Sequence, residues 1–393
     1  MLAGLLFAIH DADDRPAMLT GTLPFGGGTL IEYQARLLVA AGASQIVILV
    51  ARLTPELLGA ISRIGKRGIA VDTVRTAAEA AEKLHPLARV LMLADGLTTT
   101  ADTLGALARE GGDALLVMPE DQATQGYERV GSGMVWAGVA RIEPRRLAEL
   151  AAMPRDYDVQ STLVRLASQA RAVHVLLPQD AVRGGHGVGH SGAALDARGR
   201  TVLAGMISGH SGWFERFVTA PLARTLIPLL VPRAVPALAV AGSAGAIGVV
   251  GLLLIAFAYP GSGLLLALLG SLGLSLAATL ANLRDESASE RWLHMTAGVL
   301  PGLAVLIYGR WAAEAQAEST PEVLALGLIV LAALGERALG DAPRRTWWGS
   351  APAYLALVWA GALVSAPAAG LGLASGYAAI TLAAAIERLR RRP

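Results

Sequence analysis

Four carboxylates lie where they could bind a divalent cation. Asp11, Asp13 and Asp14 follow a short apolar run near the start of the chain, and Asp95 follows another apolar run. Carboxylate oxygens are the ligands that Mg²⁺ and Ca²⁺ prefer. One hypothesis is a metal site built from these four acids. The alternative is a solvated acidic loop beside a single aspartate.

A later segment is rich in glycine and histidine. Nine glycines occur from Gly184 to Gly212, and His186, His190 and His210 lie among them. The histidines could bind a metal, but no helical pattern places the first two on one face, so polar loop residues are the alternative. Gly189-His-Ser-Gly-Ala193 comes close to the nucleophile elbow of hydrolases. Because no clear strand pattern precedes it, we do not expect a hydrolase.

Apolar runs that alternate with amphipathic segments must position these residues. Five runs predict buried strands: Leu5–Ile9, Gln45–Val50, Ile69–Val74, Val90–Ala94 and Ala114–Val117. Four segments between them predict helices: Leu30–Ala41, Pro55–Arg63, Ala77–Leu84 and Asp102–Arg109. This alternation predicts a doubly wound, Rossmann-like α/β domain with a mostly parallel sheet. Its ligands are expected beyond the carboxyl ends of the strands, in loops 10–29, 51–54, 95–101 and 119–133.

Three stretches of this half carry a family resemblance. They are Pro24-Phe-Gly-Gly-Gly-Thr-Leu-Ile-Glu32, Arg89-Val-Leu-Met-Leu-Ala-Asp95 and Gly131-Ser-Gly-Met-Val-Trp136. Together they resemble the sugar-phosphate and molybdenum-cofactor nucleotidyltransferases, over about 175 residues. The resemblance implies that Pro24, Gly26, Gly27 and Asp95 bind a nucleotide. It also implies that Asp95 binds Mg²⁺ and that Arg15 and Asp95 are catalytic.

The first loop departs from the pattern of that family. The family's loop is glycine-rich, so that backbone N–H groups can cradle a triphosphate. Here His10-Asp-Ala-Asp-Asp-Arg15 takes its place, and its three carboxylates repel phosphate. The family's lysine is also missing, since Lys66 and Lys83 lie in helical stretches elsewhere, and no second metal aspartate is identified within residues 184–192. We therefore expect weak nucleotide binding.

The second part of the chain is strongly apolar. Hydrophobic residues make up 54% of the protein and charged residues 16%, and residues 233–393 hold only 11 Lys and Arg and 9 Asp and Glu. The fifty residues 234–283 carry no charge, which suffices for two spans of about 20 residues and a turn. Further apolar stretches lie at about 293–312, 322–339, 351–366 and 368–386. An all-α domain of six transmembrane helices is expected.

The distribution of arginine predicts the topology. Nine arginines lie in the loops on one side of the expected spans, whereas the other side has only Arg310. The positive-inside rule then places both termini in the cytoplasm, in a multi-pass protein of a bacterial-type inner membrane. Met1–Ile9 has no basic segment typical of a signal peptide. The expected division is a soluble domain over 1–180, a glycine-rich joint with an interfacial amphipathic helix over 181–232, and a membrane domain over 233–393.

Composition excludes several other classes of protein. The net charge of +2 argues against a nucleic-acid binder, which needs concentrated basic surface. The chain has no cysteine, which excludes disulfides, cysteine-ligated zinc and iron–sulfur clusters.

The membrane half carries a second resemblance. Leu222-Ala-Arg-Thr-Leu-Ile-Pro-Leu-Leu230 and the number of spans resemble fusions of an inositol-phosphate cytidylyltransferase with a CDP-alcohol phosphatidyltransferase. Such transferases hold two divalent cations with four aspartates on facing helices. The matching stretch, 275–298, has only Asp285, Glu286 and Glu290, which are expected on a loop. The resemblance therefore implies the fold of the family without its acidic apparatus.

Two function classes compete on these grounds. The favoured one is a membrane-anchored, nucleotidyltransferase-like protein of phospholipid head-group metabolism, with weakened or lost catalysis and a binding or scaffolding role. The other is an active nucleotidyltransferase that uses CTP, a phospho-alcohol and an atypical acidic metal-binding loop. The expected partners are membrane lipid, a nucleotide (CTP or a CDP-alcohol) and a second copy bound through the membrane domain. Mg²⁺ is the expected cofactor.

Overall fold

The computed structural model of the protein describes residues 1–123, 127–154, 157–208, 212–230, 235–283, 287–339 and 345–390. The chain folds into two compact units, Met1–Leu203 and Ala204–Pro393. The first is a mixed α/β domain and the second is helical. The boundary between them lies inside the segment 181–232 that the sequence predicts as the joint.

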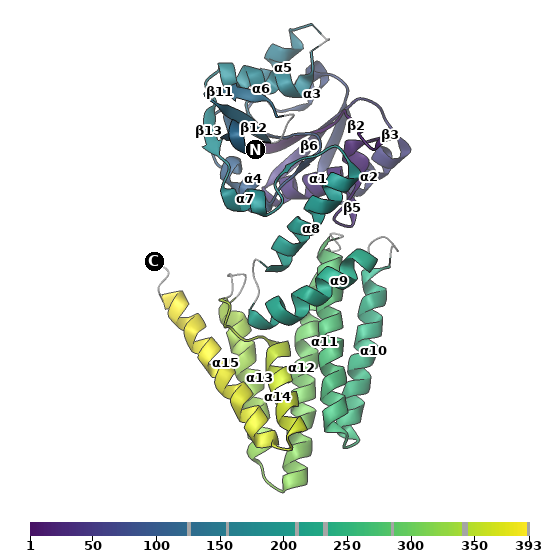
Figure 1. Cartoon of the computed structure of the whole chain (residues 1–393), viewed down its shortest axis with the longest axis vertical. Helices are drawn as coiled ribbons and strands as arrows, with labels where there is room; N and C mark the ends of the chain where they lie inside the picture. The colour runs from purple at the N-terminus through teal and green to yellow at the C-terminus, as the bar shows by residue number, and fades with distance from the viewer. Residues whose placement is uncertain are drawn as a thin grey trace. The chain divides into compact units, whose positions relative to one another are not determined.

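An eight-stranded sheet forms the centre of the first unit (Figure 1). The strands are β1 (Leu2–Ala8), β6 (Ala43–Val50), β7 (Ala70–Val74), β8 (Arg89–Leu93), β10 (Ala114–Pro119), β11 (Arg129–Gly131), β12 (Met134–Ile142) and β13 (Val173–Leu176). Their order is β13-β10-β12-β8-β1-β6-β7, with β11 paired to β12. Strand β12 runs antiparallel to β8 and β10, whereas β1 is parallel to both of its neighbours. The predicted α/β sheet is confirmed, with an antiparallel strand in its middle.

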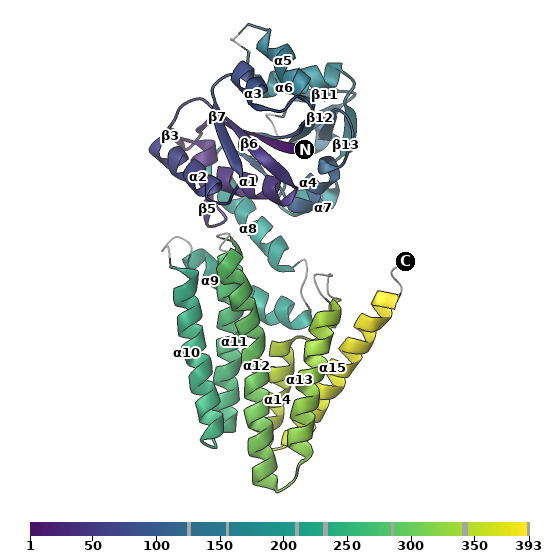
Figure 2. The same cartoon turned by 180° about the vertical axis from the view of Figure 1, so that it is seen from behind.

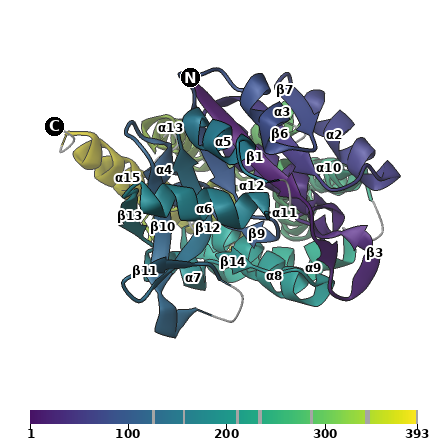
Figure 3. The same ribbon diagram turned by 90° about the horizontal axis from the view of Figure 1, so that it is seen from above.

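Helices cover both faces of this sheet (Figure 3). On one face α1 (Leu30–Ala40) packs against α2 (Pro55–Gly65) and α4 (Ala101–Ala108). On the other face α5 (Pro144–Ala151) packs against α3 (Ala77–Lys83) and α6 (Val159–Gln169). Because both faces of the central strand are covered, every residue of β1 is buried.

The five strands and four helices predicted from the sequence are all present, within a few residues at their ends. Local caps explain the helix starts. The hydroxyls of Thr54 and Thr76 accept hydrogen bonds from the backbone N–H groups of Leu57 and Glu79. Thr29 begins α1 with a capping box, in which the Glu32 carboxylate accepts from the Thr29 N–H.

Short elements occupy the loops at the carboxyl edge of the sheet. Loop 10–29 forms two small hairpins, β2 (Asp11–Ala12) with β3 (Arg15–Leu19), and β4 (Pro24–Phe25) with β5 (Gly28–Thr29), separated by η1 (Thr20–Thr22). Strand β9 (Leu97–Thr98) follows β8 and pairs with β14 (Gly187–Val188). The remaining short elements are η2 (Glu120–Gln122) and α7 (Gln179–Arg183).

The predicted glycine-rich joint contains a helix. Helix α8 runs from Gly192 to Ser208, where the sequence was interpreted as a loop. The carbonyl of Ser191 accepts from the Leu195 N–H at 3.0 Å, and its hydroxyl accepts from the Ala194 N–H at 3.3 Å. A capping serine followed by alanine, leucine and arginine favours a helix strongly enough to outweigh the few glycines within it.

The second unit consists of helices (Figure 2). A π-helical turn, η3 (Glu215–Thr219), leads into α9 (Ala220–Leu230), so the helix predicted after Trp213 is present. Six further helices follow: α10 (Ala237–Ala256), α11 (Pro260–Leu283), α12 (Ser287–Gln316), α13 (Thr320–Leu339), α14 (Ala351–Leu363) and α15 (Pro367–Arg390).

Three of these helices are long and apolar enough to cross a membrane. Within the described residues they are α10, residues Pro260–Ala281 of α11, and α15. Helix α14 is apolar but has only 13 residues, about 20 Å at 1.5 Å per residue. That is shorter than a hydrocarbon core of about 30 Å. The protein is therefore membrane-associated by the length and composition of three helices.

Candidate functional site

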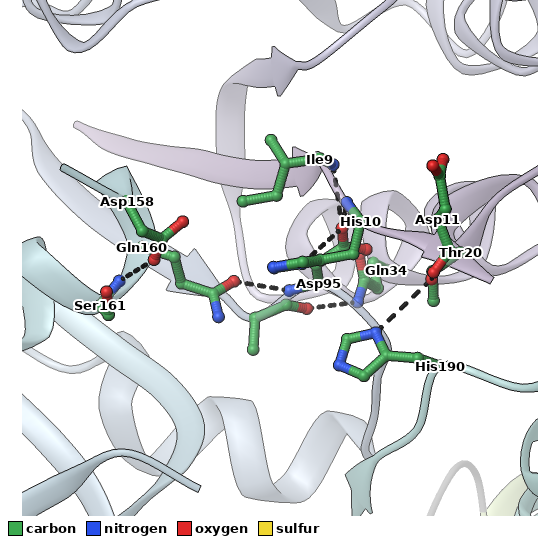
Figure 4. A network of polar contacts seen from close by, with 11 residues as sticks. Ile9, His10, Asp11, Thr20, Gln34, Asp95, Asp158, Gln160, Ser161 and His190 are labelled. Atoms are coloured by element: carbon green, nitrogen blue, oxygen red, sulfur yellow. Dashed lines mark hydrogen bonds and ion pairs between the residues drawn. The ribbon is translucent and has the colours of Figure 1, made fainter. Parts of the chain in front are cut away.

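The candidate site lies where the strand order of the sheet reverses. From β1 the chain proceeds to β6 and β7 on one side, and then returns to place β8 on the other side of β1. In open α/β sheets the crevice beyond the carboxyl ends of two such strands is the usual place for a ligand. Here His10 follows β1 and Asp95 follows β8 (Figure 4).

Asp95 is anchored by the end of β1. Its Oδ2 atom accepts hydrogen bonds from the backbone N–H groups of Ile9 and His10, at 2.9 and 2.8 Å. Its own N–H donates to Oε1 of Gln160 at 2.8 Å. The residue is 1% exposed. Asp95 thus joins β1, β8 and the first turn of α6.

A buried glutamine holds the turn that presents Asp95. The side-chain amide of Gln34, on α1, donates to the carbonyls of Ala94 and Leu97 at 3.0 and 2.9 Å. Gly96 between them has a φ of +76°, a conformation that glycine adopts without strain. Sequence reasoning missed both Gln34 and Gln160. Neither belongs to a motif, and their hydrogen-bond partners lie 60 to 65 residues away in the sequence.

His10 forms an ion pair with Asp95. Nδ1 of its ring lies 3.3 Å from Oδ2 of Asp95, and its side chain is 46% exposed. The hydrogen bond to Asp95 raises the pKa of His10 above its usual value, with smaller contributions from the charges of Asp95, Asp158 and Asp11. The ring is therefore oriented by a buried carboxylate, and its other nitrogen remains available to a ligand.

A second histidine, His190, lies beside His10, although it is near the end of the α/β unit in sequence. The ring of His190 lies 5.2 Å from that of His10, edge to face, and its Nδ1 is 3.5 Å from the Thr20 hydroxyl. Burial lowers the pKa of His190. Two neighbouring imidazoles with opposite pKa shifts can act as proton donor and proton acceptor. From the sequence, His190 was a candidate metal ligand or a polar loop residue, and its contact with His10 was not predicted.

One oxygen of Asp95 has no hydrogen-bond partner among the residues that the structure describes. Oδ1 is buried and accepts no hydrogen bond. A buried carboxylate oxygen without a donor is costly, and such an atom in a crevice is typical of a ligand-binding position. The chemical group that it would accept from is a hydroxyl, an N–H or a cation.

The three acids of the first loop do not gather around Asp95. Asp11 forms an ion pair with Arg52 at 2.6 Å, and both carboxylate oxygens of Asp14 accept from the N–H of Gly192. Among the described residues, no group of three or more His, Asp or Glu side chains is placed to hold a metal ion. Mg²⁺ prefers six oxygen ligands. One free carboxylate oxygen beside an imidazole does not fit that preference.

The predicted catalytic residue Arg15 and the other predicted nucleotide-binding residues lie on the two hairpins. Arg15 is exposed on β3 and Pro24 is exposed on β4. Gly26 and Gly27 have φ values of +59° and +89° and form the two-residue turn of the second hairpin. In the part of the chain that the structure describes, no hydrogen bond or ion pair joins any of the four to Asp95. The catalytic role of Arg15 and the nucleotide-binding role of Pro24, Gly26 and Gly27 stay predictions.

His186 has a structural role. Its Nε2 lies 2.8 Å from the carbonyl of Ala137, so this nitrogen carries the proton. Its Nδ1 therefore accepts from the Thr99 hydroxyl at 2.8 Å. Burial lowers the pKa of His186 to about 4. The third candidate, His210, lies outside the described residues, as do Asp285 and Glu286 of the membrane half and the side chain of Glu290.

Comparison with known proteins leaves the family assignment open. No protein-family model matches this chain, and no curated protein matches it.

Proposed function

We propose that this protein is a membrane-anchored, nucleotidyltransferase-like protein of phospholipid head-group metabolism, in which the α/β unit binds a ligand without transferring a nucleotidyl group. The observation that carries the proposal is the hydrogen bonding of Asp95. By the family resemblance this residue would bind the catalytic Mg²⁺. Here its Oδ2 atom is occupied by two backbone N–H groups and the His10 ring.

The surroundings of Asp95 support a binding role. The acids nearest in sequence to His10 are directed toward Arg52 and Gly192, and their charges oppose a triphosphate. Each like charge near a phosphate costs on the order of 1 kcal/mol at surface-like dielectric. Oδ1 of Asp95, which has no partner among the described residues, and the second ring nitrogen of the half-exposed His10 could hold a hydroxyl and an anionic group.

The helical unit supports membrane anchoring. Beyond the three helices that qualify as spans, we propose that all six helices from α10 to α15 cross the membrane, with both termini in the cytoplasm of a bacterial-type cell. Helix α9 is proposed to lie in the cytoplasmic interface. Phe217, Leu222 and Leu226 are exposed on η3 and α9, and Arg216 lies over the ring of Phe217.

The test uses the full chain in lipid nanodiscs. Pyrophosphate release from CTP and an inositol phosphate is measured with Mg²⁺ or Mn²⁺, together with exchange of label between CMP and CDP-diacylglycerol. We expect neither reaction. We also expect calorimetry to show CTP or CDP-alcohol binding that is weaker than micromolar and unchanged when EDTA replaces Mg²⁺.

Two outcomes would overturn this proposal. Mg²⁺-dependent pyrophosphate release that is lost in Asp95→Asn would make the α/β unit an active nucleotidyltransferase, which is the alternative function. Metal-dependent label exchange that is lost in Asp285→Asn or Glu290→Gln would place a transferase site in the membrane half.

A further inference from the structure

A short segment covers the turn that carries Asp95. Strand β14, Gly187–Val188, pairs with β9 directly after this turn. The N–H of Gly189 donates to the carbonyl of Gly96 at 3.0 Å. Thr98 of β9 is fully buried, and its hydroxyl lies within hydrogen-bonding distance of the carbonyls of Gly185 and Gly187, at 2.8 and 3.1 Å. We call residues 187–192 the strap.

The hairpin β2–β3 holds the strap in place. The N–H of Asp13 donates to the carbonyl of His190 at 2.8 Å. The N–H of Gly192 donates to both carboxylate oxygens of Asp14, at 3.1 and 3.0 Å. These contacts come from the turn of the hairpin, which begins immediately after His10. The strap is thus fastened from the β1 side as well as the β8 side of the crevice.

The contact of Asp14 is suited to a reversible latch. Gly192 is the first residue of α8, and an anion is favoured at a helix N-terminus, where N–H groups are unpaired. A charge-assisted hydrogen bond is stronger than a neutral one. Because this bond is exposed to solvent, water can replace it at modest cost.

Opening of the strap would expose Oδ1 of Asp95, a buried atom for which the described part of the chain supplies no partner. Oδ1 of Asp95 is enclosed, while the ring of His190 and the carbonyl of Gly189 lie against Gly96, the next residue. We propose that residues 187–192 form a strap over the crevice, latched by the Asp14 carboxylate at the start of α8, and that the latch must open before a ligand reaches Asp95.

The test takes advantage of a chain that has no cysteine. Thr98→Cys in the full-length protein places a single thiol beneath the strap, and the rate of maleimide labelling reports its opening. We expect Asp14→Ala to raise this rate at least about tenfold, the change that corresponds to loss of one charge-assisted hydrogen bond. Asp13→Ala is the matched control. It removes the same charge one residue away and keeps the backbone N–H that bonds to His190.

Two further measurements distinguish local opening from unfolding. Ala167→Cys, in the core on α6, reports opening of the whole α/β unit, and its labelling should not change in Asp14→Ala. A chain that carries only Asp14→Ala avoids any effect of the introduced thiol. In that chain, hydrogen exchange should be faster at the amides of Gly189 and Gly192. Equal acceleration at positions 98 and 167, or equal rates in Asp14→Ala and Asp13→Ala, would overturn the proposal.

Discussion

At the scale of single residues, the site contrasts two imidazoles a few ångströms apart. His10 gains a proton more readily because a buried carboxylate accepts from its ring. His190 loses one more readily because it is half-buried, and the neighbouring His10 adds to this effect. The pKa values of two histidines are thus shifted in opposite directions by their different surroundings. Asp95 accounts for the raised pKa of His10, whereas its charge opposes the lowering of the pKa of His190.

The first prediction concerns the charge of His10. Asp95→Asn removes the carboxylate that favours the imidazolium, so the pKa of His10 should fall. Asp158→Asn is the matched control, because Asp158 acts on His10 only through a weaker, longer-range charge effect, and should lower the pKa less. NMR titration of the full chain with ¹⁵N-labelled histidine measures both. Equal shifts in the two variants would contradict the assigned ion pair.

The second prediction concerns His186 and acid stability. Its folded pKa of about 4 lies below its ordinary value of 6.5, so the unfolded chain binds the proton first as pH falls. Its neutral form therefore contributes fully above about pH 6.5, and stability is lost as pH decreases from 6.5 toward 4. At 1.36 kcal/mol per pKa unit the loss is about 3 kcal/mol.

Hydrogen exchange of the α/β unit in the full-length protein, measured from pH 7 to pH 4, checks this expectation. His186→Asn should be less stable at pH 7 and should lose less stability on acidification. His174→Asn, at an exposed position, should behave as the wild type does. An unchanged pH profile in His186→Asn would show that another group controls acid unfolding.

At the scale of elements, the helical unit is held together by small residues. A β-carbon added at Gly270 of α11 would lie 2.7 Å from the Cα of Gly248 on α10, and one at Gly273 would lie 2.6 Å from Cβ of Ala244. Gly361 of α14 and Gly370 of α15 face each other equally closely. Such close approach is the usual means by which helices associate in lipid, where no hydrophobic force drives them together.

The third prediction tests this packing. Gly270→Ala should destabilise the helical unit by about 1–3 kcal/mol, because backbone and not a flexible side chain opposes the added methyl group. Gly245→Ala on α10, where nothing lies within 4 Å of the added atom, should stabilise it by up to about 1 kcal/mol through helix propensity. Thermal unfolding in detergent measures both. A Gly270→Ala protein as stable as the wild type would mean that α10 and α11 pack differently.

At the scale of the whole molecule, the chain combines an α/β unit with a helical unit in which three helices of the described residues are long and apolar enough to cross a membrane. The fourth prediction concerns the number of spans. If six helices cross the membrane with both ends in the cytoplasm, alkaline phosphatase fused after Pro393 should be inactive. The enzyme inserted after Ala317, between α12 and α13, should be active in the periplasm. Activity at the C-terminal fusion would require an odd number of spans.

Much of the architecture was predictable because it depends on local pattern. The apolar run of β1 and the capping residues of α1 are visible in consecutive residues of the sequence, so both elements could be predicted without knowing any distant contact. The apolar character of α10 and α11 is likewise independent of any distant contact. The start of α8 was missed because its glycines suggested a loop, and the capping role of Ser191 shows only in its hydrogen bonds.

The sequence by itself determined the α/β class, the apolar helices and the position of Asp95 at the end of a strand, since hydrophobic period and strand-to-loop transitions are local properties. Only the tertiary structure decided what Asp95 does there. Its Oδ2 atom accepts hydrogen bonds from Ile9 and His10, which are 86 and 85 residues away in the sequence. The Asp14 carboxylate accepts from Gly192, which is 178 residues away. A resemblance to a metal-binding strand could not reveal these partners. They depend on which strands become neighbours, and that is settled by burial of the whole sheet and not by any stretch of it.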